Sequence, residues 1–539
     1  MILKPGRVIP VLVFLISFAF YFFLQRMHPL TGDEFNLLAG ADRILNGQVP
    51  YRDFFQFITP GSMYLAALLF FIFGIKYYII KIATALIGSL IITLTYILSR
   101  RIIEKPLFAL MPAAYCLLFS MPFFPIYSHH WLSTLFLLAA VNLAVSSFER
   151  NSLLMIFFSG LLAGLTFISL QHKGALLLLA ILSTLIFSYF YYKENLIKPC
   201  LWLMAGFASI MIPFSLYLFF SGSLKNMLYD CFVWVYEGYL PFNSYPAYCY
   251  SSKRYISYFF REFGFPENLL KARNFLLIAY LPLFVIVHGG LTLLRTLYSN
   301  RGTDRGKTDR TFFLYYITSI LLFVFAVLPR PDDSHILFVF QPIVILFSLC
   351  LQDIYLQPKQ KNLRSLVISA IAAAIAVSFI ANSLLGSLNK IKEASGYIFP
   401  VIAKRGVIFT NNTDEYAYYR DTLAYIEDEI KGENIFIYTW STFFYFLPGK
   451  KNFTKYDGFI PGYNTNRQMD EVIEEIKKNN IGYILYDGYD RFIKEQGENS
   501  HYPLAGDLID PENNLVKFIE KNYESVKTIK KMVIYRKIK

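Results

Sequence analysis

The sequence predicts a polytopic α-helical membrane protein with a small α/β domain at its C-terminal end. Of its 539 residues, 55% are hydrophobic and 17% are charged, which is far too apolar for a soluble protein of this size. Apolar segments recur through the first 390 residues, and most approach the roughly 20 residues that a spanning helix needs. The pattern then becomes mixed polar and apolar. We therefore expect a transmembrane domain over 1–390 and an α/β domain over 391–539.

Twelve apolar segments are candidates for membrane helices. They cover residues 8–25, 61–75, 77–99, 107–125, 132–148, 151–170, 174–192, 199–220, 274–297, 312–329, 336–356 and 365–387. Short basic connectors such as Arg100-Arg101 and Arg150 separate alternate segments, and such connectors face the cytoplasm. This assignment puts the first loop 26–60, the long loop 221–273 and the C-terminal domain on the outer side.

The number of crossings has a parity problem. An inner N-terminus and an outer C-terminal domain require an odd number of spans, whereas twelve segments are even. Segment 61–75 is the weakest because it is short and opens with Thr59-Pro60-Gly61. This segment lies at the interface or enters the membrane only partway; alternatively, the chain has a thirteenth span that the apolar pattern does not reveal. We expect about 11 to 13 transmembrane helices.

The residues after 388 alternate between helical and strand patterns. Ranges 422–431 and 468–479 have helical periodicity, while 434–438 and 481–486 are short apolar runs typical of buried strands. Strand–helix–strand alternation favours a small parallel-sheet domain. Residues 401–539 carry 20 Lys and Arg against 21 Asp and Glu, so the net charge of +13 comes from the membrane part. That distribution argues against nucleic-acid binding.

Two adjacent carboxylates, Asp33 and Glu34, follow the first apolar segment. Ionisable groups at a membrane boundary are costly to desolvate and are therefore functional candidates. A carboxylate beside an apolar wall can have its pKa tuned for proton abstraction. We identify Asp33 as a candidate general base, with Glu34 orienting it or weakly holding Mg²⁺ or Mn²⁺. Alternatively, both are solvated and cap a helix that begins near Phe35.

A second polar group lies late in the membrane part, between two spans on the same expected side. It contains Arg330, Asp333 and His335. Arginine binds phosphate through several hydrogen-bond donors, and histidine donates a hydrogen bond to a phosphate or a sugar hydroxyl. We therefore expect these residues to bind substrate. The alternative is a polar turn in which Arg330 pairs with Asp332 and Asp333.

His129, His130 and Lys173 occupy two further outer connections. Adjacent histidines do not share a helix face and make a poor pair of metal ligands. We expect His129 and His130 to contact substrate, or else to form an interfacial turn. Lys173 either neutralises a lipid phosphate or extends toward the interface. We identify no metal site.

The outer loops hold other candidates. Arg43, Arg52 and Asp53 lie in the first loop, where they could bind phosphate or brace the acidic pair. The long loop 221–273 holds eight tyrosines. It forms a lid, a sugar-stacking surface or an interfacial segment.

Together these features resemble the GT-C membrane glycosyltransferases. The resemblance rests on Asp33-Glu34 after span one, on Ile44-Leu45-Asn46-Gly47-Gln48-Val49-Pro50-Tyr51-Arg52-Asp53-Phe54, on Thr59-Pro60-Gly61, and on Arg330…Asp333-Ser334-His335 followed by Gln341-Pro342. It covers about residues 8–390. The most similar branch contains the bacterial enzymes that resemble protein O-mannosyltransferases and the aminoarabinose transferase of lipid A. This chain differs from the latter at Ile58-Thr59-Pro60-Gly61, where relatives have Lys before Pro-Pro, and at His129-His130, where they have Asp.

The resemblance implies a transferase of the bacterial inner membrane. A sugar on a polyprenyl phosphate would pass, with inversion, to a lipid, glycan or protein acceptor on the extracytoplasmic face. Asp33 would be the catalytic base, and Arg330, His335, Arg52 or Lys173 would stabilise the departing phosphate. No cofactor is implied beyond a weak divalent cation.

Three other classes stay open. An O-antigen ligase or polymerase is also polytopic, but needs neither the first-loop acids nor the C-terminal domain. A transporter or flippase usually has internal repeats and charges at mid-membrane, whereas the charges here lie at span ends. The third class is a scaffold without catalytic activity.

Overall fold

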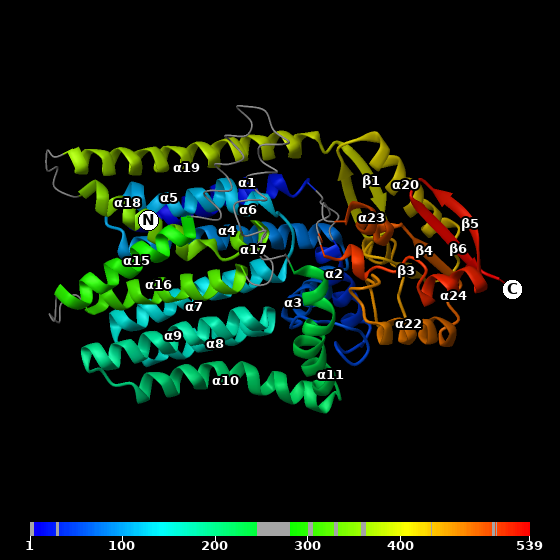
Figure 1. The fold of residues 1–539 in the computed structure, drawn as a ribbon, viewed down its shortest axis with the longest axis horizontal. Coiled ribbons are helices and arrows are strands. Elements are labelled where there is room, and N and C mark those ends of the chain that lie inside the picture. The colour runs from blue at the N-terminus through cyan, green and yellow to red at the C-terminus, as the bar shows by residue number, and fades with distance from the viewer. Residues whose placement is uncertain are drawn as a thin grey trace.

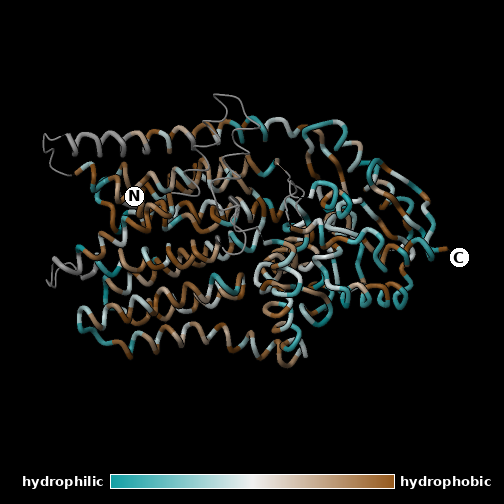
Figure 2. The backbone as a smooth tube through the Cα atoms, viewed as in Figure 1, coloured by the Kyte–Doolittle hydropathy of each residue, from teal (hydrophilic) through white to brown (hydrophobic). Residues whose placement is uncertain are grey.

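The computed structural model describes residues 5–27, 32–244, 281–299, 306–327, 333–356, 363–432, 434–497, 502 and 504–538. Long helices lie side by side in a bundle, and the α/β domain covers one end of it (Figure 1). We call this the domain end and the opposite side the far end. Hydrophobic residues run along the bundle, while hydrophilic residues are frequent over the α/β domain (Figure 2).

The bundle is built from helices that satisfy their own backbone hydrogen bonds, as a lipid environment demands. They are α1 (Pro5–Leu24), α4 (Tyr77–Ile102), α5 (Pro106–Tyr115) continued through η1 (Cys116–Ser120) and α6 (Met121–Phe123), α7 (His129–Arg150), α8 (Leu153–Ser169), α9 (Gln171–Tyr192), α10 (Ile197–Phe220), α15 (Leu281–Ser299), α16 (Gly306–Val327), α18 (Phe340–Leu356) and α19 (Leu363–Gly396). Within the described ranges, six helices are long and apolar enough to cross a membrane, and others are apolar but shorter.

Helix α3 (Gly61–Phe73) coincides with the weakest predicted span. Its 13 residues extend about 20 Å, less than the roughly 30 Å of hydrocarbon in a bilayer. It packs against α2 (Gly32–Leu45) at the domain end (Figure 1). Without α3, the part of the chain that the structure describes supplies eleven helical segments to the bundle. Eleven lies within the expected range of 11 to 13, and it is an odd number, as an inner N-terminus and an outer C-terminal domain would require.

The described part of the long loop crosses the domain end (Figure 1). It forms α11 (Leu224–Leu228), the π-helical turns η2 (Tyr229–Val233) and η3 (Val235–Tyr239), and α12 (Leu240–Asn243). Trp234 is fully buried against Phe55 and Phe57 of the first loop. The rest of the loop, including five of its eight tyrosines, lies outside the described residues.

The C-terminal part begins with an antiparallel hairpin of β1 (Phe399–Ala403) and β2 (Gly406–Thr410). A four-stranded sheet follows in the order β3-β4-β6-β5. Its strands are β3 (Phe436–Tyr438), β4 (Tyr483–Tyr486), β5 (Tyr523–Ile529) and β6 (Met532–Lys537). Its helices are α20 (Thr413–Asp428), α21 (Phe443–Phe446), α22 (Asn466–Lys478), α23 (Tyr489–Gln496) and α24 (Asn514–Asn522), with a 3₁₀ turn, η8 (Gly506–Leu508).

The expectation of a parallel sheet is correct for one pair of strands and wrong for the others. β3 and β4 pair in parallel across the connection that contains α22, but β6 pairs antiparallel with both β4 and β5. The two C-terminal strands form a hairpin, and a hairpin makes antiparallel neighbours. The predicted helix at 422–431 is the end of a longer helix, because Asn412 caps α20 by accepting a hydrogen bond from the Glu415 N–H.

Candidate active site

The first loop forms a helix, α2, whose first turn carries both predicted carboxylates. The Glu34 side chain is fully buried. Its carboxylate accepts hydrogen bonds from Tyr77 Oη at 2.6 Å, Lys81 Nζ at 3.1 Å and the Tyr127 backbone N–H at 2.9 Å. Burial of a carboxylate is tolerable only with such partners. Glu34 therefore fixes the start of α2 to α4 and to the segment that precedes α7.

Asp33 lies beside this buried carboxylate and is itself exposed. Its neighbour Gly32 packs directly against the indole of Trp440 from the C-terminal domain. A Cβ atom at Gly32 would fall 1.4 Å from Trp440 Cδ1, so no side chain fits there. The exposed carboxylate thus lies at the boundary between the bundle and the α/β domain.

A cluster of basic and aromatic groups lies at the same end of the bundle; we call it the His–Lys cluster. It consists of His129 and His130 at the start of α7, Lys173 on α9, and His335 on the short helix α17 (Asp333–Leu337). The His129 and His130 rings are 4.2 Å apart between centroids, and the His130 and His335 rings are 5.5 Å apart. Three segments far apart in the sequence therefore meet here.

Lys173 is buried, and within the described chain its hydrogen-bond acceptors are all neutral. Its Nζ donates to Thr134 Oγ1 at 2.9 Å, the His130 carbonyl at 3.2 Å and the Phe338 carbonyl at 3.4 Å. His129 Nδ1 is also buried, and none of the described residues forms a hydrogen bond with it. A buried ammonium with neutral acceptors is costly to maintain. An anionic ligand would compensate this cost.

The His–Lys cluster and the carboxylates are connected through the backbone. The Tyr127 N–H binds Glu34, and two residues later the chain reaches His129. Ser128 caps α7 by accepting a hydrogen bond from the His130 N–H at 3.1 Å. This cap sets where α7 begins and therefore where both histidines lie.

Arg52 and Asp53 are placed differently. They pair with each other through two hydrogen bonds of 2.9 and 2.7 Å. The Val49 N–H also donates to Asp53. These contacts hold the pKa of the Asp53 carboxyl below its ordinary value, with the Arg52 hydrogen bond as the largest cause. The pair lies at a surface turn, and no contact between it and the His–Lys cluster is seen in the described ranges. Arg330 and the side chain of Asp333 lie outside the described residues.

Two residues of this region, Lys81 and Trp440, are not identified from the sequence, and a third, Arg43, is identified but has an unexpected partner. Lys81 interrupts the apolar run 77–99, and an ionisable residue inside a span is a functional signal. Arg43 is predicted to bind phosphate or to brace the acidic pair; in the structure it pairs with Asp457 of the C-terminal domain at 2.8 Å. Trp440 carries no such signal, because only the fold brings it to Gly32.

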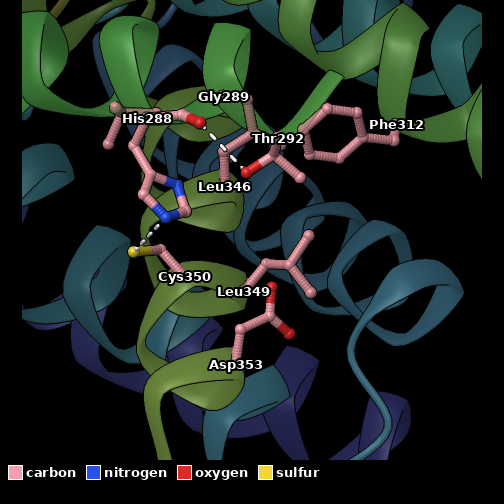
Figure 3. A pocket seen from close by; sticks show the side chains of 9 residues that line it. His288, Gly289, Thr292, Phe312, Leu346, Leu349, Cys350 and Asp353 are labelled. Atoms are coloured by element: carbon pink, nitrogen blue, oxygen red, sulfur yellow. Dashed lines mark hydrogen bonds between the residues drawn. The ribbon is translucent and has the colours of Figure 1, made fainter. Parts of the chain in front are cut away.

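A small cavity lies between α15, α16 and α18 (Figure 3). His288 Nε2 and Cys350 Sγ approach to 3.5 Å in it. Cys350 is ten residues along α18 from Phe340, or about three helical turns from the end of α18 nearest Lys173. Across the described ranges, no group of three or more His, Cys, Asp or Glu residues is placed to hold a metal ion. This cavity is separate from the His–Lys cluster.

Comparison with known proteins identifies the fold. No protein-family model matches the sequence, and no curated protein matches it. Solved structures do match. The oligosaccharyltransferase of Archaeoglobus fulgidus, solved with zinc and sulfate, matches with a TM-score of 0.54 and 14% identity, over 95% of this chain and 71% of its own.

The ArnT structures from Cupriavidus metallidurans match over almost their whole length. The form bound to undecaprenyl phosphate gives a TM-score of 0.54 and 11% identity, and the apo form 0.54 and 12%. Each covers 99% of both chains. The chain has the fold of the GT-C membrane glycosyltransferases, as the resemblance in its sequence implies.

Proposed function

We propose that the protein is a membrane glycosyltransferase that moves a sugar from a polyprenyl-phosphate donor to a lipid, glycan or protein acceptor. The observation that carries this proposal is the His–Lys cluster, in which the buried Lys173 has only neutral acceptors in the described chain. Such a site suits a phosphate. A similar protein, ArnT, has been solved with undecaprenyl phosphate, which is the lipid phosphate that such a donor releases.

Asp33 is the general base in this proposal. As the acceptor hydroxyl attacks the anomeric carbon, Asp33 takes the hydroxyl proton. The bond from the anomeric carbon to the phosphate oxygen breaks, and its electron pair leaves with the polyprenyl phosphate. Attack from the face opposite the leaving group inverts the configuration. Proton transfer to a positioned base contributes typically 10²–10⁴-fold to a rate.

The departing phosphate gains negative charge, because a phosphodiester becomes a phosphomonoester. Lys173, in its protonated form, supplies a positive charge, and the imidazoles of His129, His130 and His335 supply hydrogen-bond donors. Groups that face developing charge stabilise a transition state without reorganising. Glu34 is a positioning residue here, since its oxygens are already engaged by Tyr77, Lys81 and Tyr127. Arg330 and Asp333 remain proposed substrate-binding residues.

We also propose that the domain end faces away from the cytoplasm in a bacterial inner membrane. Arg101 and Arg310 lie at the far end, where they pair with Glu149 and Glu194. Basic connectors of this kind face the cytoplasm.

No metal ion has an assigned role in the proposal. A weakly bound Mg²⁺ or Mn²⁺ near Asp33 is tested by measuring transfer with and without EDTA.

The test is transfer of radiolabelled sugar in membranes that carry the protein, using a panel of polyprenyl-monophosphate and polyprenyl-diphosphate donors. Transfer from a monophosphate donor is the expected result. Transfer from diphosphate donors alone would contradict it and indicate a ligase or polymerase. Movement of a lipid-linked sugar across the membrane of proteoliposomes, without sugar transfer to an acceptor, would indicate a carrier.

A further inference from the structure

The helix that carries Asp33 is fixed at both ends by residues outside the first loop. At its start, Glu34 binds Tyr77, Lys81 and Tyr127. At its end, Asp42 and Arg43 both pair with the C-terminal domain. Because α2 has only 14 residues, a shift at its end reaches Asp33 within about four turns.

Arg405, in the turn of the β1–β2 hairpin, contacts both ends of this arrangement. Its Nη1 and Nη2 donate to the two carboxylate oxygens of Asp42 at 3.0 and 3.1 Å. Its backbone carbonyl accepts a hydrogen bond from the Tyr77 N–H at 2.8 Å. Tyr77 is the residue whose hydroxyl binds Glu34, next to Asp33. One residue therefore fixes the end of α2 directly and its start through Tyr77.

The surroundings of Arg405 keep it in this position. Its guanidinium lies 5.3 Å from the centroid of the Phe446 ring, and its backbone N–H donates to the Leu447 carbonyl at 3.1 Å. Gly406 approaches Tyr77 so closely that a Cβ atom would be 2.8 Å from Tyr77 Cβ. The planar, two-pronged guanidinium matches a carboxylate in a way that a lysine cannot reproduce.

We propose that Arg405 is a positioning residue for the general base, so that the C-terminal domain is part of the catalytic machinery. This inference rests on the proposed function, because it needs Asp33 to be the base. It assigns to the α/β domain a role in the rate of the chemical step, separate from donor binding at the His–Lys cluster. Small displacements of a reacting group can lower a rate about 10²-fold.

The test compares Arg405→Lys with the native enzyme in detergent or membranes, with rates expressed per folded protein. We expect kcat to fall about 10- to 100-fold and the KM for the polyprenyl-phosphate donor to stay within about twofold. Asp42→Asn, which keeps the side-chain shape, is expected to act in the same direction. The charge exchange Asp42→Arg with Arg405→Asp is expected to restore part of kcat. Arg536→Lys is the matched control, because Arg536 forms an exposed pair with Glu524 in the same domain.

A second measurement separates positioning from general stability. In an Asp33→Asn background, Arg405→Lys is expected to cause no further loss in single-turnover rate, because a residue that acts through Asp33 has nothing left to position. The inference is overturned if Arg405→Lys still lowers the single-turnover rate in the Asp33→Asn background. It is also overturned if Arg405→Lys raises the KM for the donor instead of lowering kcat, or if it leaves kcat per folded enzyme unchanged. If the native enzyme transfers no sugar from any donor, the proposed function itself fails.

Discussion

The first loop contains two charged regions that are built in opposite ways. In α2, Asp42 and Arg43 pair with residues more than 360 positions away, and these pairs are largely buried. In the turn that follows, Arg52 and Asp53 pair with each other, and the Arg52 side chain is 45% exposed. The comparison teaches that charge in this loop has two uses. One region joins the bundle to the α/β domain around Asp33, and the other closes an exposed turn that also contacts the Ser221 carbonyl at the end of α10.

The largest expected effect is on stability and separates the two regions directly. Arg43→Ala leaves Asp457 buried without its main partner, and also frees the carbonyls of Asn452 and Thr454. Removing one member of a buried ion pair destabilises a protein by about 3–5 kcal/mol. Arg52→Ala removes an exposed pair, worth about 0–1 kcal/mol. Chemical unfolding of both variants in detergent measures the difference.

The same pair predicts a pH dependence for that loss. Burial raises the pKa of Asp457 above its ordinary value, and Arg43 opposes the rise. Without Arg43, the protonated form of the Asp457 carboxyl is favoured more strongly. A raised folded pKa gives stability at low pH that is lost as pH rises through it. The Arg43→Ala deficit is therefore expected to shrink as pH falls. If Arg43→Ala and Arg52→Ala lowered the free energy of unfolding equally at every pH, the proposed difference between the two regions would be wrong.

The next largest effect concerns the His–Lys cluster. Lys173→Met removes a buried charge whose described acceptors are neutral. We expect kcat/KM to fall roughly 10²–10³-fold, while the melting temperature stays equal or rises, because an apolar side chain of similar length avoids the desolvation cost. Activity and thermal unfolding measured on one preparation test this. A fall in both would indicate a structural lysine, and unchanged activity would remove Lys173 from the phosphate site.

The smallest effect concerns Asp230 in η2, a carboxylate near the first loop. Burial raises its pKa to about 7, while Lys455 and the backbone of Gln56 oppose the rise. The folded state therefore holds the proton more tightly than the unfolded chain. This contribution is present below the ordinary pKa and is lost as pH rises toward 7.

Asp230→Asn removes that contribution. Between pH 4 and 7, the free energy of unfolding of the native protein is expected to fall by roughly 1–3 kcal/mol more than that of the variant. Melting temperatures of the variant and the native protein across this range check it. Parallel curves for the two proteins would show that Asp230 does not titrate there.

Composition and apolar periodicity predict the membrane bundle and the C-terminal α/β domain, because both patterns follow from local sequence. The antiparallel half of the sheet is not predicted, since strand pairing depends on partners distant in the chain. The site divides in the same way. The sequence identifies His129, His130, Lys173 and His335 as polar residues in outer connections between spans. Their meeting at one place depends on the packing of α7, α9 and α17.

The roles of neighbouring charges are the hardest to predict. Asp33 and Glu34 are adjacent carboxylates in the sequence, but in the structure Asp33 is exposed and Glu34 is fully buried with three partners. Arg405 and Trp440 have no feature in the sequence that connects them to α2. Each belongs to an interface between two parts of the fold, and such contacts appear only once both parts are placed.

The most direct test of the account is the rate of sugar transfer by Asp33→Asn, measured with the donor that the panel identifies and compared with Glu34→Gln. The account predicts that Asp33→Asn remains folded and inserted but transfers sugar about 10²–10⁴-fold more slowly. It predicts that Glu34→Gln lowers the melting temperature, because Lys81 then lacks its buried counter-charge. Near-native transfer by folded Asp33→Asn would contradict the assignment of Asp33 as the base.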